Sequence, residues 1–408
     1  MARILIAWEI GAGLGRLAQI VPVARGLAAQ GHRLTASMPA WMAARSGALA
    51  RAAALLGCET VAAPRAAPPA AIDAASPRSH ADVMFCHHFD TPPHLVLQAR
   101  AWQWLFASRQ ADLVMVHHAP SALFAAHAAG LPCAQFGDGY VVPPAESPLR
   151  PTTPWAPASA DAMRTAEQTV ADSVGEACRI LAVRDPGTVA GLLQTARDYL
   201  CTWPFLDHYG ARAQAYYYGI APNPIPGARI DGPGAPGPRV FAYLSDGHPL
   251  FEPLARSLVA LGWPAILVCG DVPPAPVCAT LRHLSEPVDE AVLAGCDLVV
   301  SHAPLLTSAR ALAQGKPMLA LPVNAEQRMV CVQLIGLGTA RWVDAADLAA
   351  ARADPRAALT EALAALAGDR RHADRARAIA DALRGVDAEA AQLELIDDLC
   401  TDFGLRSG

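Results

Sequence analysis

The chain has 408 residues, of which 53% are hydrophobic and 17% charged, and its formal net charge is −5 at pH 7. This length and apolar content exclude a disordered chain and a small disulfide-stapled one, and they suit two globular domains. A net negative charge without basic clusters excludes nucleic acid as the main partner.

The cysteines and the apolar runs bear on the compartment. The ten cysteines show neither a C-x-x-C pair nor Cys/His ligand spacing, which argues against a zinc site and a disulfide framework. Glu9 interrupts the N-terminal apolar run before it reaches the length of a signal peptide, and Pro and His break the longest charge-free stretch, 113–137. We therefore expect a soluble cytoplasmic protein without a membrane span or a metal site.

The first part of the chain alternates short apolar runs with helical patterns. Strands are predicted over 4–8, 34–38, 113–116 and 132–136, and helices over 17–27 and 121–129. Apolar runs without polar alternation are typical of a parallel sheet buried on both faces. The pattern predicts an α/β domain with right-handed crossovers.

A Pro- and Gly-rich stretch separates a second part of the same kind. Residues 221–238 hold more breakers than a helix or a central strand tolerates, so the interdomain linker is predicted there. Beyond it, strands are predicted over 240–244, 265–269, 298–301 and 318–321, and helices over 250–261, 306–314, 356–366, 370–383 and 387–405, with a further helix ending at 291–294. The fold class predicted is two tandem doubly wound, Rossmann-like domains, an N-terminal one over 1–220 and a C-terminal one over 239–384. For the terminal segment 385–408, packing back on the N-terminal domain is one alternative.

The glycine loop after the first strand does not fit a dinucleotide site. That fingerprint needs G-x-G-x-x-G and an acidic residue at the end of the second strand. Here Arg16 stands at the third glycine position, and the strand 34–38 ends without Asp or Glu. The sequence therefore argues against a nicotinamide or flavin dehydrogenase.

Two segments resemble the glycosyltransferases of the UDP-glucuronosyltransferase and macrolide-glycosyltransferase type. The first is IAWEIGAGLGRL at 6–17, followed by Pro22 and by Gly31-His32. The second, more specific one is a donor-binding signature made of DLVVSH at 297–302, Thr307, Ala311-Leu312, Gly315-Lys316-Pro317, Pro322, Glu326-Gln327 and Gly336-Leu337-Gly338. The resemblance implies the GT-B fold, a nucleotide-diphosphate sugar as donor, an inverting transfer, and neither a cofactor nor a catalytic metal.

The predicted donor site lies in the second domain. A strand that ends at His302 and a helix that starts near Leu306 would aim backbone N–H groups and the positive helix end at a diphosphate. His302, Thr307 and Ser308 would add donors, although His302 could also be only a helix-capping side chain. The resemblance places sugar contacts at Glu326 and Gln327 and main-chain contacts to the base at Pro287 and Val288. We predict a further phosphate contact at Ser245.

Two departures from the family pattern weaken the match. Arg16 stands where the family usually has the His that takes the proton from the acceptor, and a guanidinium is no base at neutral pH. Ala303-Pro304 replace the common Gly-Gly after the donor-site His, which removes one backbone donor and adds bulk.

Three hypotheses follow for the acceptor side. The base could have moved to Glu9, His117 or His118; these two histidines end a strand, so at most one is expected to face the acceptor. Alternatively, an acceptor that is already ionised needs no base, and Arg16 with the loop at Gly13 would position it. His87, His88 and Asp90 form a further cluster in a predicted loop, which could contact the acceptor.

The third hypothesis is a catalytically silent protein that binds a sugar nucleotide or supports a partner transferase. A sugar-nucleotide epimerase is a weaker alternative, because no set of carboxylates can be placed around the sugar. The favoured interpretation is a bacterial transferase that moves a sugar from a UDP- or TDP-linked donor to a small-molecule or peptide acceptor. The oligomeric state stays open between a monomer and a homodimer.

Overall fold

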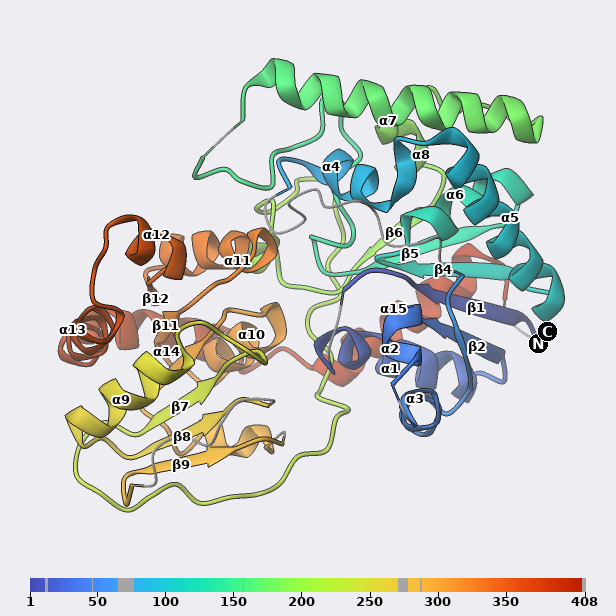
Figure 1. Ribbon diagram of the computed structural model, residues 1–408. Helices are drawn as coiled ribbons and strands as arrows, with labels where there is room; N and C mark the ends of the chain where they lie inside the picture. The colour runs from blue at the N-terminus through green and yellow to red at the C-terminus, as the bar shows by residue number, and fades with distance from the viewer. Residues whose placement is uncertain are drawn as a thin grey trace. The chain divides into compact units, whose positions relative to one another are not determined.

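The computed structural model describes residues 1–11, 14–45, 47–64, 77–156, 158–270, 278–286 and 288–405. The chain divides into two compact units, drawn in Figure 1: unit 1 comprises Met1–Pro224 and Asp387–Gly408, and unit 2 comprises Ile225–Val386. The division falls inside the stretch 221–238 predicted as a linker. Unit 1 is therefore discontinuous in sequence, with unit 2 inserted into it.

Unit 1 contains a parallel six-stranded sheet in the order β3-β2-β1-β4-β5-β6. Its strands are β1 (Arg3–Trp8), β2 (Arg33–Met38), β3 (Glu59–Ala62), β4 (Leu113–His117), β5 (Cys133–Gly137) and β6 (Arg197–Leu200). The central strands are buried on both faces, as their uninterrupted apolar runs predict. Alternate side chains of β1 enter two different cores, Leu5 and Ala7 one and Ile4 and Ile6 the other.

The helices of unit 1 cover the sheet from both faces. Its helical segments are α1 (Leu14–Ala29), α2 (Ala40–Ala43), α3 (Ala48–Leu56), α4 (His80–Met84), η1 (Phe85–Phe89), α5 (Pro92–Arg109), α6 (Pro120–Ala129), α7 (Ala160–Leu181), α8 (Val189–Leu193), η2 (Pro204–Leu206) and α15 (Ala388–Asp402). Helices α1, α3 and α15 share one core, and α5, α6, α7 and α8 share the other.

Helix α15 comes from the end of the chain and packs on α1, beside which it is drawn in Figure 1. Three of its carboxylates, spaced four residues apart, accept hydrogen bonds from tyrosines of unit 1. The pairs are Tyr216–Glu394, Tyr218–Asp398 at 2.7 Å and Tyr199–Asp402 at 2.6 Å. Helix α15 is therefore held to unit 1 both by these hydrogen bonds and by its apolar side, which enters the core.

Unit 2 repeats the strand order of unit 1, as β12-β11-β10-β7-β8-β9. Its strands are β7 (Val240–Tyr243), β8 (Ala265–Val268), β9 (Leu281–Leu284), β10 (Leu298–Ser301), β11 (Met318–Ala320) and β12 (Ala340–Trp342). Its helices are α9 (Phe251–Leu261), η3 (Glu290–Leu293), α10 (Leu305–Ala313), α11 (Ala325–Gly336), α12 (Ala345–Ala350), α13 (Pro355–Gly368) and α14 (Arg370–Leu383). The predicted fold class is confirmed by these two doubly wound sheets.

The strand order places one ligand-binding edge in each unit. In an open parallel sheet, ligands bind beyond the carboxyl ends of the two strands between which the strand order reverses. Those strands are β1 and β4 in unit 1 and β7 and β10 in unit 2. The segments after these four strands hold the predicted site residues Glu9, His118, Ser245 and His302.

Some local predictions were wrong. The helix expected to end at 291–294 is only the short 3-10 turn η3. His87 and His88, predicted to lie in a loop, have non-helical backbone at a kink within η1. Sequence patterns also left out β3, β6, β9 and β12, each of which contains exposed or half-buried positions. A half-buried edge strand lacks the continuous apolar run by which the inner strands are found.

Candidate functional site

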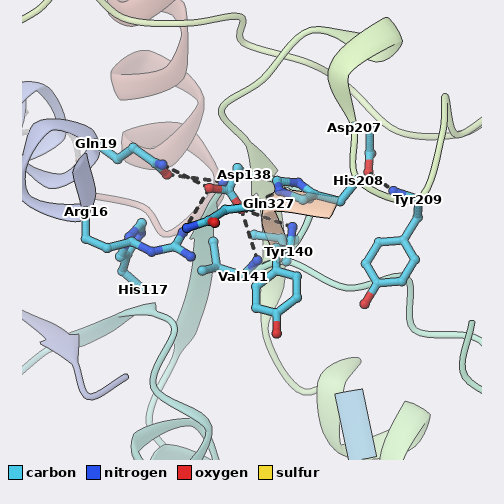
Figure 2. Close-up of polar contacts among 12 residues, drawn as sticks. Arg16, Gln19, His117, Asp138, Tyr140, Val141, Asp207, His208, Tyr209 and Gln327 are labelled. Atoms are coloured by element: carbon cyan, nitrogen blue, oxygen red, sulfur yellow. Dashed lines mark hydrogen bonds and ion pairs between the residues drawn. The ribbon is translucent and has the colours of Figure 1, made fainter. Parts of the chain in front are cut away.

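In unit 1, Arg16 is buried in an ion pair. Its guanidinium Nη1 lies 2.9 Å from Oδ2 of Asp138, and the two side chains are only 7% and 1% exposed (Figure 2). Gln19, one turn further along α1, donates from Nε2 to the same oxygen at 2.9 Å. Arg16 is therefore neutralised within the protein, which argues against the hypothesis that it positions an ionised acceptor.

Asp138 follows β5 and receives donors from several directions. Its Oδ1 accepts the backbone N–H groups of Tyr140 at 3.0 Å and Val141 at 3.3 Å. Burial disfavours the charge, but the cation of Arg16, with smaller help from His208 and Gln19, holds the pKa of Asp138 below its usual range. The carboxylate thus stays ionised and fixes the turn after β5.

A second buried ion pair supports the same turn. Arg212 lies 2.8 Å from Asp207 and donates to the carbonyl oxygens of Gly139 at 3.3 Å and Val142 at 2.7 Å. The hydroxyl of Tyr217 donates to Asp207 at 2.9 Å. Sequence patterns missed this network, because Asp207 and Arg212 stand in irregular backbone that has no periodic signal.

His117 ends β4 and is fixed by its neighbours. Its Nδ1 lies 3.0 Å from the carbonyl oxygen of Phe136, which can only accept, so Nδ1 carries the proton. Burial, with help from the Arg16 charge, lowers the pKa of His117 to about 3. The ring is therefore neutral. It packs so closely on Gly137 that a Cβ at that position would lie 2.9 Å from Nδ1.

His118 is held differently. It adopts φ 53°, a left-handed conformation that is uncommon outside glycine, and its ring packs edge-on against Tyr140 at 5.6 Å. Within the described residues neither ring nitrogen has a hydrogen-bond partner, although the residue is only 5% exposed. Burial first, then the charges of Arg16, His80 and His87, lowers the pKa of His118 well below its ordinary value. His118 is thus a neutral imidazole with unused nitrogen atoms beside the loop after β1.

Glu9 is committed to the protein. Its carboxylate accepts the backbone N–H of Ser121 at 3.0 Å, the Ser121 hydroxyl, and the side-chain N–H groups of Trp102 and Gln98, both at 3.2 Å. Burial raises the pKa of Glu9, while these hydrogen bonds act in the opposite direction. The contacts argue against the hypothesis that Glu9 is the base.

The remaining acceptor-side predictions fall partly outside this site. His88 has φ 68° and packs edge-on against His94 at 5.2 Å, and Asp90 is exposed at the end of η1. Of His87, His88 and Asp90, His87 is the one whose charge lowers the pKa of His118. Gly13 lies outside the described residues.

In unit 2, His302 directly follows β10 at the edge where the strand order reverses. Its Nδ1 lies 3.3 Å from the carbonyl oxygen of Tyr243 and therefore carries the proton. Burial, with a smaller contribution from His248, lowers the pKa of His302 to about 4. Its Nε2 is then the acceptor-capable nitrogen of a neutral ring.

Helix α10 begins directly behind His302. Ala303 adopts φ 58° and donates its N–H to Ser301 Oγ at 3.1 Å, and Pro304 caps the helix without a side-chain hydrogen bond. The residues predicted to hold a diphosphate, Leu306, Thr307 and Ser308, therefore stand in the first turn of α10. The Ser308 hydroxyl is buried and has no partner in the described parts of the chain.

The other donor-side predictions lie on neighbouring loops. Ser245 follows β7, and its carbonyl accepts the N–H of His248 at 3.2 Å. Val288 forms a parallel bridge with Ala228, so part of its main chain is used by the segment that leads into unit 2. Pro287 lies outside the described residues.

Glu326 and Gln327 open α11. Asn324 caps this helix by accepting the N–H of Gln327 at 3.0 Å, and Gln327 Oε1 accepts the N–H of Val323 at 2.8 Å. Gln327 thus accepts from the residue before the N-cap, so its oxygen is used locally and only its amide nitrogen is left for a ligand. Glu326 is half-buried in the same first turn.

Neither a metal-ion cluster nor a membrane-spanning helix is found among the described residues. No three His, Cys, Asp or Glu side chains come together in a way that could hold a metal ion, as far as the described residues go. Over the same residues, no helix combines the length and apolar character that crossing a membrane requires.

Solved structures show the same two-unit fold. CalG4, the calicheamicin glycosyltransferase, matches with a TM-score of 0.67 and 16% identity over 100% of this chain and 99% of its own. The glycosyltransferase VinC, in complex with dTDP, matches with a TM-score of 0.65 and 17% identity over 99% and 100%. The spinosyn rhamnosyltransferase SpnG, complexed with spinosyn aglycone, matches with a TM-score of 0.60 and 16% identity over 98% and 100%.

No protein-family model and no curated protein matches the chain. The structural likeness shows that the chain has the GT-B fold of these glycosyltransferases from end to end.

Proposed function

We propose that this protein is a glycosyltransferase that moves a sugar from a UDP- or TDP-linked donor to a small-molecule or peptide acceptor, with inversion and without a metal. The observation that carries the proposal is His302 beside the N-terminus of α10, at the edge of unit 2 where the strand order reverses. The fold supports it, since similarly folded glycosyltransferases include one in complex with dTDP and one with an aglycone.

On the donor side, α10 would stabilise the leaving nucleoside diphosphate. Its first-turn N–H groups carry the positive end of the helix dipole, and the hydroxyls of Thr307 and Ser308 add donors. Negative charge grows on the diphosphate as the sugar bond breaks, so donors already fixed in place favour the transition state over the bound substrate. Glu326 and the Gln327 amide would contact the sugar hydroxyls.

On the acceptor side, His118 is our choice for the general base. It is neutral, it is buried, and its nitrogen atoms are unused within the described residues. Glu9 is bound by four donors, and His117 has only its Nε2 left, because its Nδ1 is bound to Phe136. A proton taken from the acceptor hydroxyl would stay on His118 until water removes it.

The buried Arg16–Asp138 pair favours a second candidate, a silent protein that binds a sugar nucleotide without transferring the sugar. In that case the pair fills the place of the family's base with a structural contact. Binding and turnover therefore have to be measured separately.

The first experiment is a calorimetric titration of the full chain with TDP, UDP and GDP. We expect one diphosphate to bind, His302→Ala to weaken it at least tenfold, and His372→Ala to leave it unchanged. His372 is the control because it also lies in unit 2 and is bound to a carbonyl, that of Gly338. Absence of binding, or equal affinity in His302→Ala, would overturn the proposal.

Turnover is measured as nucleoside diphosphate release from the corresponding glucose conjugate, with water and simple phenols as acceptors. If His118 is the base, His118→Gln lowers kcat most for an alcohol or water and least for an acidic phenol, since the latter ionises without help. A loss that is the same for every acceptor would count against His118. Binding without any release would favour the silent candidate.

A further inference from the structure

Units 1 and 2 repeat one stretch of backbone. In unit 1 the register pairs Ile4 of β1 with Leu113 of β4, and in unit 2 it pairs Val240 of β7 with Leu298 of β10. Counted from these pairs, helix α6 after β4 and helix α10 after β10 begin at equivalent positions, Pro120 and Leu305.

The backbone details agree over this stretch. His118 and Ala303, at equivalent positions before the two helices, have φ angles of 53° and 58°. Gly130 and Gly315, at equivalent positions after them, have φ angles of 64° and 67°. The two units therefore present the same helix N-terminus at the same edge of the same sheet.

The side chains that face these two helix N-termini differ. By the register, Glu9 of unit 1 is equivalent to Ser245 of unit 2, and Ser121 is equivalent to Leu306. In unit 1, Glu9 accepts the N–H of Ser121 at 3.0 Å. In unit 2, no described residue accepts the equivalent N–H of Leu306.

Every described group that is hydrogen-bonded to the Glu9 carboxylate donates to it. A backbone N–H, an indole N–H and an amide N–H can only donate, so they select an ionised carboxylate over any group that would donate itself. Gln98 and Trp102, on α5, close the site from the other side and are 8% and 0% exposed. The Glu9 carboxylate thus occupies a site lined by donors, where it takes the place that an anionic ligand would take.

We propose that Glu9 determines which of the two equivalent helix N-termini takes the donor diphosphate, because its carboxylate fills in unit 1 the anion position that Ser245 leaves open in unit 2. The binding of the donor diphosphate at α10 rests on the proposed function. The occupation of an anion site in unit 1 by Glu9 does not depend on it. Glu9 would thereby reserve the edge of unit 1 for an acceptor.

The first test replaces Glu9 by the residue of unit 2. In Glu9→Ser the site is emptied, so the melting temperature of unit 1 should fall by about 4 °C, and inorganic phosphate should restore most of this loss. Sodium chloride at equal ionic strength should not. In wild type and in Glu176→Ser, which changes a half-buried glutamate of α7, the transition of unit 1 should show no response specific to phosphate.

Two results would overturn the proposal: an unchanged melting temperature in Glu9→Ser, or equal stabilisation of wild type and Glu9→Ser by phosphate. Neither depends on a nucleotide, so the test still decides if the protein binds no diphosphate and the proposed function fails.

The converse variant covers the case in which Glu9→Ser does not fold. Ser245→Glu installs the carboxylate in unit 2 and should melt at a higher temperature than Ser245→Gln, since only the former supplies an anion to the helix N-terminus. It should also bind TDP at least tenfold more weakly than Ser245→Gln. Equal melting temperatures of the two variants would contradict the equivalence of Glu9 and Ser245.

Discussion

The sequence singles out Arg16 but does not predict its ion pair with Asp138. The sequence identifies Arg16 as a departure from the expected histidine, but it does not reveal the partner 122 positions away. Asp138 had a usable signal, since it comes two residues after the predicted strand 132–136, at the edge of the sheet where polar side chains meet ligands. His302 and its helix could be placed for the same reason, whereas Gln19 and Arg212 act only through contacts that folding creates.

The burial of this pair predicts a large cost when one partner is removed. Arg16→Met leaves the Asp138 carboxylate buried without its cation, and we expect the free energy of unfolding to fall by about 3 kcal/mol. Arg3→Met removes a similar pair with Asp112 that is 39% and 42% exposed, and its effect should be much smaller. Urea denaturation measures both, and equal losses would contradict the distinction between buried and exposed pairs.

The protonation of His302 predicts a pH dependence of binding. Its Nδ1–H is used by Tyr243, so donation to a phosphate oxygen from Nε2 needs the imidazolium form. Because the pKa of His302 is lowered to about 4 in the folded protein, the ring is neutral at pH 7 and must take up a proton on binding. Affinity for a nucleoside diphosphate should therefore fall as pH rises.

Calorimetry in two buffers of different ionisation enthalpy measures this proton uptake. His302→Gln is the control, because the titration of the nucleotide itself is the same in both proteins. Equal uptake in wild type and His302→Gln would show that the proton goes elsewhere.

Among the elements, the inner strands and the last helices could be predicted, and several others could not. Helix α7 carries a recognisable signal, since Val170, Val174 and Cys178 recur on one buried side. The edge strands have no such signal, because water reaches part of each one. That α15 returns to unit 1 follows from its contacts with α1 and not from its own pattern, which fits any amphipathic helix.

The close approach of α1 and α15 predicts the effect of one methyl group. A Cβ on Gly26 would lie 2.6 Å from Cγ1 of Ile396, which is itself buried and cannot move aside. Gly26→Ala should therefore lower the free energy of unfolding by about 2 kcal/mol. Gly15→Ala, on the same helix with nothing within 4 Å, should be neutral or slightly stabilising. Chemical denaturation of both variants decides, and a Gly26→Ala protein as stable as wild type would refute the tight contact.

At the scale of the molecule, the two units have separate cores, which predicts separable unfolding. The buried clusters of unit 1 contain no residue of unit 2, and the cluster described for unit 2 contains none of unit 1. Scanning calorimetry should resolve two transitions. Saturating TDP should raise only the one that belongs to unit 2, by about 5 °C or more at a hundredfold excess over Kd. A single transition, or an equal shift of both, would contradict independent units.

The discontinuity of unit 1 has a consequence for how the chain is made. The sheet of unit 1 is synthesised before unit 2, yet the core around α1 stays open until Leu395, Ile396 and Leu399 leave the ribosome. Unit 2 is complete before that point, because its last residue, Val386, precedes α15. Unit 1 therefore begins before unit 2 but closes after it, and until then the apolar side of α1 is exposed to chaperones in the nascent chain.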